Sequence, residues 1–282
     1  MSNAVRINAR LLIIDPQNDF CDIPGAALPV TGANADMNRL ALFLNRASDF
    51  ITSITVTLDS HPSVAIERTT FWQCADGSSV EPFTEITEAD VREGRFLPQH
   101  PEHLELALEY LRALEAGGRY RLMVWPVHCV LGTWGHNIHG TVANALSGWE
   151  FRHQKPVHKV LKGLNPFTEQ YSAIQAEVPR EDDPSTRTNH ALIQHLREGD
   201  GPLFVAGEAS SHCVAATMQH LMRDHFTPEE CAQVILLSDC MSPVAGFEEK
   251  VEEFFRFAEG LGARVMTSED AHTLLLDSKQ KM

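Results

Sequence analysis

The fold of this chain is decided first by an apolar stretch near its start, RLLIID at residues 10–15. Its hydrophobic residues follow one another without the alternation of a half-buried strand, which is typical of strands buried on both faces. Similar short runs recur at residues 50–59, 121–126, 157–163, 203–207, 234–239 and 263–266. The pattern predicts a sheet of mostly parallel strands.

Stretches with helical spacing of apolar residues separate these runs, at residues 37–44, 101–116, 214–221 and 251–261. Pro101 is placed to begin the second helix and Gly117 to end it. Strands that alternate with helices predict an α/β fold whose sheet is covered by helices on both faces.

One polar and acidic segment, residues 73–103, interrupts this rhythm and shows no clear periodicity. We expect one domain spanning residues 1–282, with an insertion at about 73–120 that returns to the sheet through the 101–116 helix. Long loops in compact domains are often functional. The excursion is therefore interpreted as a lid at the pocket mouth, an oligomer contact or a solvated loop.

Composition narrows the choice of partners and of compartment. The formal net charge of −15 argues against a nucleic-acid partner, because neutralising phosphates requires clustered Lys and Arg. No apolar run is long enough to cross a membrane, and residues 1–8 do not resemble a signal peptide. The six cysteines form no CxxC pair, so we expect free thiols and a cytoplasmic location.

Chemically capable side chains follow the predicted strands. Ligands of open parallel sheets bind at the carboxyl ends of the strands. The residues expected there are Asp15, Asp59 with His61, Trp125 with His128, Lys162, and Cys213. Their joint placement predicts a single site at this edge.

Cys213 stands where a helix is expected to begin, directly after the strand at 203–207. The positive end of a helix and a nearby Lys162 favour the thiolate, and Asp15 is available as a base. The alternative is a buried structural thiol, which is the commoner fate of a free cysteine.

Asp59 and His61 are two residues apart, so both side chains reach the same side of an extended backbone. A carboxylate with an imidazole suits Zn²⁺, Mn²⁺ or Fe²⁺, and His128 adds a further ligand. The D-x-H pattern alone is a weak signal of a metal site.

Several motifs resemble those of the nicotinamidases and related cysteine hydrolases of the isochorismatase-like superfamily. They are DPQNDF at 15–20, DSHP at 59–62, WPVHCVLGTWG at 125–135, KG at 162–163 followed by YSA at 171–173, and GEASSHCV at 207–214. They occur in the family's order between about Leu11 and Asp239, and only the 125–135 segment is specific by itself.

The resemblance implies a Rossmann-like sheet and a Cys213–Asp15–Lys162 triad that hydrolyses a small planar amide such as nicotinamide through a thioester. It implies an oxyanion hole from the N–H groups of Ala209 and Cys213, with a cis peptide between Glu208 and Ala209. It places Phe20, Trp125, Glu208 and His212 at the substrate. It implies one divalent metal ion, most simply Zn, on Asp59, His61 and His128, and we expect a homo-oligomer.

Three positions depart from the family pattern. Ser60 replaces an aromatic residue, Glu67 stands where a second His often follows, and Glu208 replaces an aliphatic residue. Glu67 is therefore a candidate fourth metal ligand. The alternatives left open are another amide, carbamoyl compound or imide as substrate, a metallohydrolase without a Cys nucleophile, and a non-catalytic binding or scaffold protein.

Overall fold

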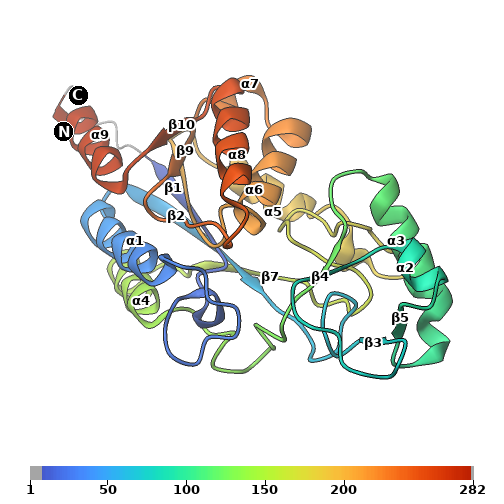
Figure 1. Ribbon diagram of the computed structural model, residues 1–282. Helices are drawn as coiled ribbons and strands as arrows, with labels where there is room; N and C mark the ends of the chain where they lie inside the picture. The colour runs from blue at the N-terminus through green and yellow to red at the C-terminus, as the bar shows by residue number, and fades with distance from the viewer. Residues whose placement is uncertain (1–7, 281–282) are drawn as a thin grey trace.

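The central sheet organises the computed structural model, which describes residues 8–280 (Figure 1). Residues 1–7, most of the segment in which no signal peptide is expected, lie outside this range. The sheet's strands are β1 (Ala9–Ile14), β2 (Ile51–Asp59), β7 (His158–Lys162), β8 (Leu203–Gly207), β9 (Val234–Leu237) and β10 (Arg264–Met266).

All neighbouring strands of this sheet run parallel, in the order β10-β9-β8-β1-β2-β7. Strand β1 lies between β8 and β2, and every one of its residues is buried. The unbroken apolar run at residues 10–14 therefore reports a central position with both faces covered. The predicted α/β class with a mostly parallel sheet is confirmed.

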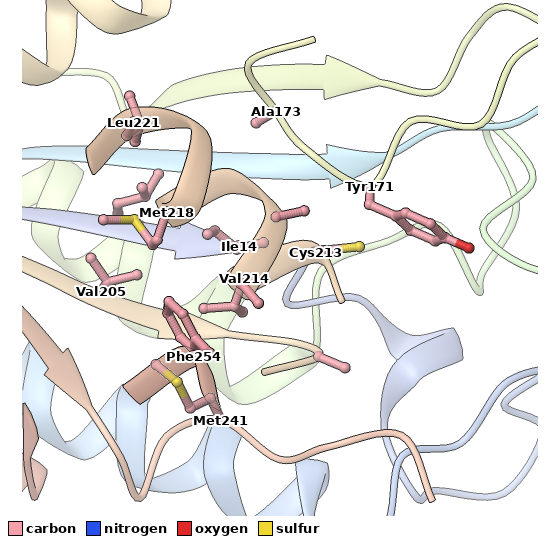
Figure 2. Packing of buried hydrophobic residues seen from close by; sticks show 14 of the residues in the cluster. Ile14, Tyr171, Ala173, Val205, Cys213, Val214, Met218, Leu221, Met241 and Phe254 are labelled. Carbon is pink, nitrogen blue, oxygen red and sulfur yellow. The ribbon is translucent and has the colours of Figure 1, made fainter. Parts of the chain in front are cut away.

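Helices cover both faces of the sheet. One face carries α1 (Ala33–Ala47), α4 (Gly140–His153) and α9 (Ser268–Gln280). The other carries α5 (His190–Arg197), α6 (Cys213–His220) and α8 (Glu248–Gly260). Figure 2 shows the second face, where Val214 and Met218 of α6 pack between the sheet and Phe254 of α8. This packing fixes the start of α6, and with it Cys213.

Seven further helices complete the framework around these layers in the described part of the chain. They are η1 (Asn18–Phe20), α2 (Glu88–Arg92), η2 (Pro101–His103), α3 (Leu104–Ala116), η3 (Pro184–Thr186), η4 (Leu221–His225) and α7 (Pro228–Cys231). The predicted helix at 101–116 is observed as η2 running into α3, with Pro101 in its first turn. Within residues 8–280, no helix is both long and apolar enough to span a membrane.

The excursion is folded, although its sequence shows no clear periodicity. Two small antiparallel sheets pair β3 (Trp72–Cys74) with β5 (Phe96–Pro98) and β4 (Thr84–Ile86) with β6 (Leu122–Val124). They surround a third hydrophobic core that buries Trp72 and Leu111. Strands of three residues are too short to show a period of two, so the sequence pattern missed them.

Strand β6 is a correction, because the run at 121–126 was expected to join the central parallel sheet. It pairs instead with β4 of the excursion. Its apolar residues Leu122 and Val124 are buried in the third core. Hydrophobicity correctly indicated that this strand is buried, but it carries no information about which sheet the strand joins.

Candidate active site

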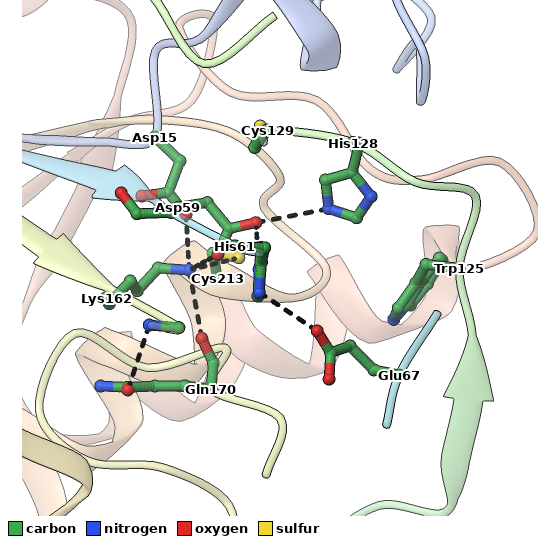
Figure 3. Close-up of polar contacts among 12 residues, drawn as sticks. Asp15, Asp59, His61, Glu67, Trp125, His128, Cys129, Lys162, Gln170 and Cys213 are labelled. Atoms are coloured by element: carbon green, nitrogen blue, oxygen red, sulfur yellow. Dashed lines mark hydrogen bonds and ion pairs between the residues drawn. The ribbon is translucent and has the colours of Figure 1, made fainter. Parts of the chain in front are cut away.

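Four adjacent strands of the central sheet deliver the candidate residues to one edge. Asp59 and Lys162 are register partners at the ends of β2 and β7. Ile14, the residue before Asp15, is the register partner of Gly207 in β8. The carboxyl ends of β7, β2, β1 and β8 therefore converge, which brings Asp15, Asp59, Lys162 and Cys213 together as the sequence predicts (Figure 3).

Lys162 is the centre of this arrangement. Its buried Nζ lies 2.9 Å from Asp15 Oδ2 and 2.7 Å from Asp59 Oδ1. It also lies 3.2 Å from the carbonyl oxygen of Gln170 and 3.5 Å from Cys213 Sγ. Burial alone lowers the pKa of Lys162, but the two carboxylates outweigh it and raise the pKa well above its usual range. The amine is therefore a permanent cation that joins both carboxylates to the thiol.

Asp15 is held in one orientation beside this cation. Thr57 Oγ1 donates to Asp15 Oδ1 at 2.6 Å, and the Asp15 N–H donates to Thr57 Oγ1 at 3.1 Å. Its φ of 45° lies in the left-handed region, which is uncommon outside glycine and recurs at functional sites. Burial and the Asp59 charge raise the pKa of Asp15, against the opposing effect of Lys162. A carboxylate with a raised pKa is a better proton acceptor.

Cys213 is the first residue of α6, and its side chain is buried. Burial raises the pKa of the Cys213 thiol well above its usual value, and the nearby Lys162 offsets only part of that rise. The sequence indicated that the helix end and Lys162 favour the thiolate, with Asp15 available as a base. Desolvation outweighs the helix end and the lysine, so the thiol needs a base to take its proton.

The turn before Cys213 depends on Gly207. Its φ is +122°, and a Cβ atom built there would lie 1.9 Å from the carbonyl oxygen of Ile14. Only glycine lets β8 approach β1 this closely at the point where the chain leaves the sheet. The Glu208–Ala209 peptide that follows is cis, as the family resemblance implies.

A group of possible metal ligands lies beside the triad. Asp59 Oδ2 is 2.8 Å from His61 Nε2 and 3.3 Å from His128 Nε2. The ligand atoms of these three buried residues all lie within 4.8 Å of one another. Glu67 Oε1 lies 3.1 Å from His61 Nδ1, and Glu169 joins His61 and Glu67 in a second such group. Asp59 thus contacts Lys162 through one oxygen and the imidazoles through the other.

This donor set suits a divalent metal ion such as Zn²⁺. Oε2 of the buried Glu67 has no hydrogen-bond partner among the described residues, so a ligand position is available there. Burial, with Arg68 second, lowers the pKa of His128 to about 4, so this imidazole is neutral as a ligand must be. The residues present therefore fit the ion that the family resemblance implies.

Arg68 borders the metal-ligand group and was not singled out from the sequence. Its guanidinium is buried, with Nη1 3.1 Å from His128 Nε2 and Nε 3.3 Å from Glu67 Oε1. A metal ion on His128 Nε2 requires the guanidinium to withdraw from that nitrogen. Nothing in the local sequence distinguishes this arginine from an exposed one, so only packing revealed it.

The thiol opens on an inner cavity lined by predicted and unpredicted side chains. The predicted ones are Phe20, Trp125, His128, Ala209, His212 and Cys213, with Asp59 at the edge of the triad. Glu169 and Tyr171 were not predicted to line it, although Tyr171 begins the motif quoted at 171–173. Tyr171 accepts a hydrogen bond from the Trp125 indole at 3.1 Å. The free volume is about 30 Å³. An aromatic ring needs on the order of 100 Å³ or more, so lining side chains must move apart to admit one.

The residues of the first motif hold this cavity together through backbone contacts. Gln17 exchanges two hydrogen bonds of 2.8 Å with the backbone of Asp59. Asp19 accepts the Cys129 N–H at 2.7 Å and so fixes the segment that carries His128. Phe20 then faces the cavity. In this motif, Asp15 belongs to the triad, Gln17 and Asp19 position the neighbouring backbone, and Phe20 forms a wall of the cavity.

The side chain of Glu208 does not reach the inner cavity, although it was predicted to contact the substrate. It is fully buried and turns toward Asp36 of α1, and its Oε2 accepts the Ser242 N–H at 3.1 Å. Ala209 lines the cavity, whereas Glu208, on the other side of the cis peptide, faces α1. Burial, followed by the Asp36 charge, raises the pKa of Glu208 well above its usual range.

Ser60 is likewise not a wall of this cavity. It is buried, and its Oγ contacts His136 Nε2 at 2.8 Å and the Leu58 carbonyl at 2.9 Å. The aromatic residue that the family carries at this position is therefore replaced here by a polar contact with a neighbouring loop.

Comparison with known proteins gives one consistent answer. No family model matches the chain. It is 26% identical to the nicotinamidase of Escherichia coli over 211 residues, covering 74% of this chain and 73% of that protein. It is 25% identical to the nicotinamidase of Saccharomyces cerevisiae over 207 residues, covering 73% and 78%.

Solved structures share the fold. The yeast nicotinamidase superposes with a TM-score of 0.62 at 20% identity, covering 92% of this chain and 99% of that one. The pyrazinamidase of Pyrococcus horikoshii, solved in complex with zinc, superposes with a TM-score of 0.53 at 18% identity, covering 92% and 99%. At these identities the likeness establishes the architecture of the sheet and its helices.

Replacing Glu208 by Gln should reduce the loss of stability at alkaline pH. A carboxyl whose pKa is raised by folding binds more protons in the native state than in the unfolded state, so stability falls as the pH rises toward the folded pKa. The amide cannot ionise and removes this contribution. Urea unfolding between about pH 5 and about pH 9 measures it. The exposed Glu252→Gln serves as control, and an unchanged pH dependence in Glu208→Gln would contradict the assignment.

Replacing His61 by Ala should strip the metal. Purified protein should carry about one divalent ion per chain, since three buried ligands converge on one point. The variant should retain a small fraction of this content after dialysis, measured by elemental analysis. His190→Ala, an exposed histidine at the start of α5, is the matched control. Equal metal content in both variants excludes His61 from the site.

Proposed function

We propose that this chain, which is similar in sequence to nicotinamidases and shares the fold of solved nicotinamidases, cleaves nicotinamide or a close planar amide to the acid and ammonia. The observation that carries this proposal is the contact of buried Lys162 with Asp15, Asp59 and Cys213. A thiol, a base and a fixed cation at the end of one cavity are what nucleophilic amide hydrolysis requires.

The proposed reaction begins with proton transfer from Cys213 to Asp15. Lys162 stabilises the negative charge of the resulting thiolate. The sulfur then attacks the amide carbonyl, and a C–S bond forms. The N–H groups of Ala209 and Cys213 are proposed to stabilise the oxyanion, a contribution of roughly 3 kcal/mol per donor in other acyl-transfer enzymes.

The tetrahedral intermediate then collapses with cleavage of the C–N bond. Asp15 returns its proton to the leaving nitrogen, which departs as ammonia and leaves a thioester on Cys213. Water, deprotonated by Asp15, attacks the thioester; the acid is released and the thiol is restored. The balance is one amide and one water consumed for one acid and one ammonia.

A divalent metal, for which zinc is proposed, would be held by Asp59, His61 and His128, with Glu67 as a candidate fourth ligand, and would supply a Lewis acid for a ring nitrogen or a bound water. Phe20 and Trp125 are proposed to lie against the faces of a flat ring. Stacking adds about 0.5–1.5 kcal/mol to simple burial, enough to favour planar substrates.

The setting of the protein is also proposed. All six cysteines are free thiols, which suits a reducing cytoplasm. We further propose that residues 1–282 form one hydrolase domain with the insertion at about 73–120, and that the chain assembles as a homo-oligomer.

Cys213→Ala should lower kcat for ammonia release by at least about 10³-fold, because it removes the nucleophile while leaving the packing of α6 largely intact. Circular dichroism and thermal unfolding check that the variant folds. Cys74→Ala, a more accessible cysteine in the excursion, is the matched control and should retain activity. Appreciable turnover by Cys213→Ala would favour a metallohydrolase without a Cys nucleophile.

A panel of amides should place nicotinamide and pyrazinamide above benzamide in kcat/KM, and benzamide above non-aromatic amides. The first step tests the proposed contact between the metal and a ring nitrogen, and the second tests stacking on Phe20 and Trp125. Ammonia release at fixed enzyme concentration measures both. Equal rates for benzamide and nicotinamide would rule out the ring-nitrogen contact, and turnover of non-aromatic amides alone would rule out stacking.

A further inference from the structure

A second, larger cavity of about 500 Å³ adjoins the inner cavity. The two share Tyr171 and His212 as lining residues, so these side chains form the partition between them. We name this space the outer cavity. The excursion and its return supply one side of it, from Glu85 to Met123, and the start of α8 supplies Phe247 and Lys250. The excursion therefore helps to build a space directly beside the proposed reaction centre.

Aromatic rings line the approach from the outer cavity to the partition. Tyr120 packs against Tyr171 with ring centroids 5.0 Å apart, and Phe247 meets the His212 ring edge-on at 4.8 Å. Lys250 Nζ lies 5.0 Å from the Phe247 ring centroid and 5.6 Å from that of Tyr120. The lysine is thus held over two aromatic rings of the outer cavity.

The acids of the outer cavity are already engaged by other groups. Glu85 pairs with Arg121 at 2.8 Å. Glu115 accepts the backbone N–H of Glu88 at 2.6 Å. Neither carboxylate is within ion-pair distance of Lys250 in the described part of the chain.

Two cations of the same cavity form no ion pair with a carboxylate in the described part of the chain. Lys250 forms no ion pair among residues 8–280. Arg119 donates hydrogen bonds to neutral acceptors, to His220 Nε2 at 2.6 Å and to Gln219 Oε1 at 2.9 Å. The acid that acts on Arg119 from nearby is Glu177, whose pKa burial raises to about 7, so its charge is only partial at neutral pH. In a chain of net charge −15, this is a local excess of positive charge.

We propose that the outer cavity binds an anionic group of the substrate, a carboxylate or a phosphate, while the amide lies at Cys213. The preferred substrate is then a planar amide whose ring carries an acidic substituent on the side away from the carboxamide. Lys250 and Arg119 are the residues that recognise the acid, and Tyr171 and His212 separate it from the reacting carbonyl. This inference rests on the proposed amidase function.

The test compares two synthetic amides that differ in charge and by one methyl group. One is a pyridine-3-carboxamide with a carboxyethyl chain on the ring carbon opposite the carboxamide, and the other is its methyl ester. The acid should exceed the ester in kcat/KM on the order of tenfold, as expected for one charge-assisted contact. Added salt should shrink this ratio, because a partly exposed ion pair is screened. The corresponding phosphonate distinguishes a phosphate site from a carboxylate site.

Lys250→Met removes the charge and keeps much of the side-chain length. The ratio of acid to ester should fall toward one in this variant, mainly through KM. Lys159→Met, an exposed lysine of β7 on the edge of the central sheet, is the matched control and should keep the wild-type ratio. Thermal unfolding of both variants verifies folding, and Lys250→Gln provides a second substitution.

Equilibrium binding separates this proposal from the proposed function. Calorimetry with the acid and the ester measures their affinities whether or not they are hydrolysed. Equal affinity and equal kcat/KM for the two compounds, with normal turnover of nicotinamide, would overturn the anion site and leave the amidase intact. Stronger binding of the acid that Lys250→Met abolishes, without hydrolysis of any amide, would support the anion site and reject the amidase.

Discussion

The ion pairs of Lys162 with Asp15 and Asp59 are the constraint on which the rest of the site depends. Three charged groups are buried together, and removing any one leaves the others uncompensated in a low-dielectric interior, at a cost of several kcal/mol. Their contacts require β7, β2 and β1 to be neighbours in one register. Asp59 connects this cluster to the metal-ligand group, because its second oxygen contacts His61 and His128. The triad and the metal-ligand group are therefore one electrostatic unit.

Backbone contacts translate this unit into a shaped cavity. Gln17 fixes the backbone of Asp59, and Asp19 fixes that of Cys129, so the segment after β1 ties the β2 end to the segment carrying His128. That segment also runs beside the chain after β2, through bridges of Val130 with His61 and of Trp125 with Arg68. This is why His128 reaches Asp59 although β6 does not belong to the central sheet. His128 and Asp59 do lie together as the sequence predicts. The prediction that residues 121–126 form a strand of the central sheet is wrong.

The excursion lies beside the candidate site without displacing the strand ends that carry Asp15, Asp59 and Lys162. Its own hydrophobic core, with Trp72 and Leu111, lets it fold beside the central sheet and leaves the strand ends in place. Phe83 from the excursion meets the Trp125 ring edge-on at 5.7 Å, so the insertion contacts a wall of the inner cavity as well. Of the readings that the sequence left open, a position beside the pocket is the one that this placement favours, and the oligomeric state stays a prediction.

The sequence alone determined the α/β class, the parallel central strands and the identity of Asp15, Asp59, Lys162 and Cys213 as neighbours, because burial on two faces and motif order are written locally in the chain. Tertiary structure decided what local patterns do not encode. It turned Glu208 toward Asp36, placed Arg68 against His128 and assigned β6 to the excursion. It also raised the pKa of Cys213, since desolvation depends on every group packed around the thiol and not on the helix end beside it. The orientation, burial and contacts of a side chain depend on the groups that pack around it in the folded protein. A local stretch of sequence does not specify those groups.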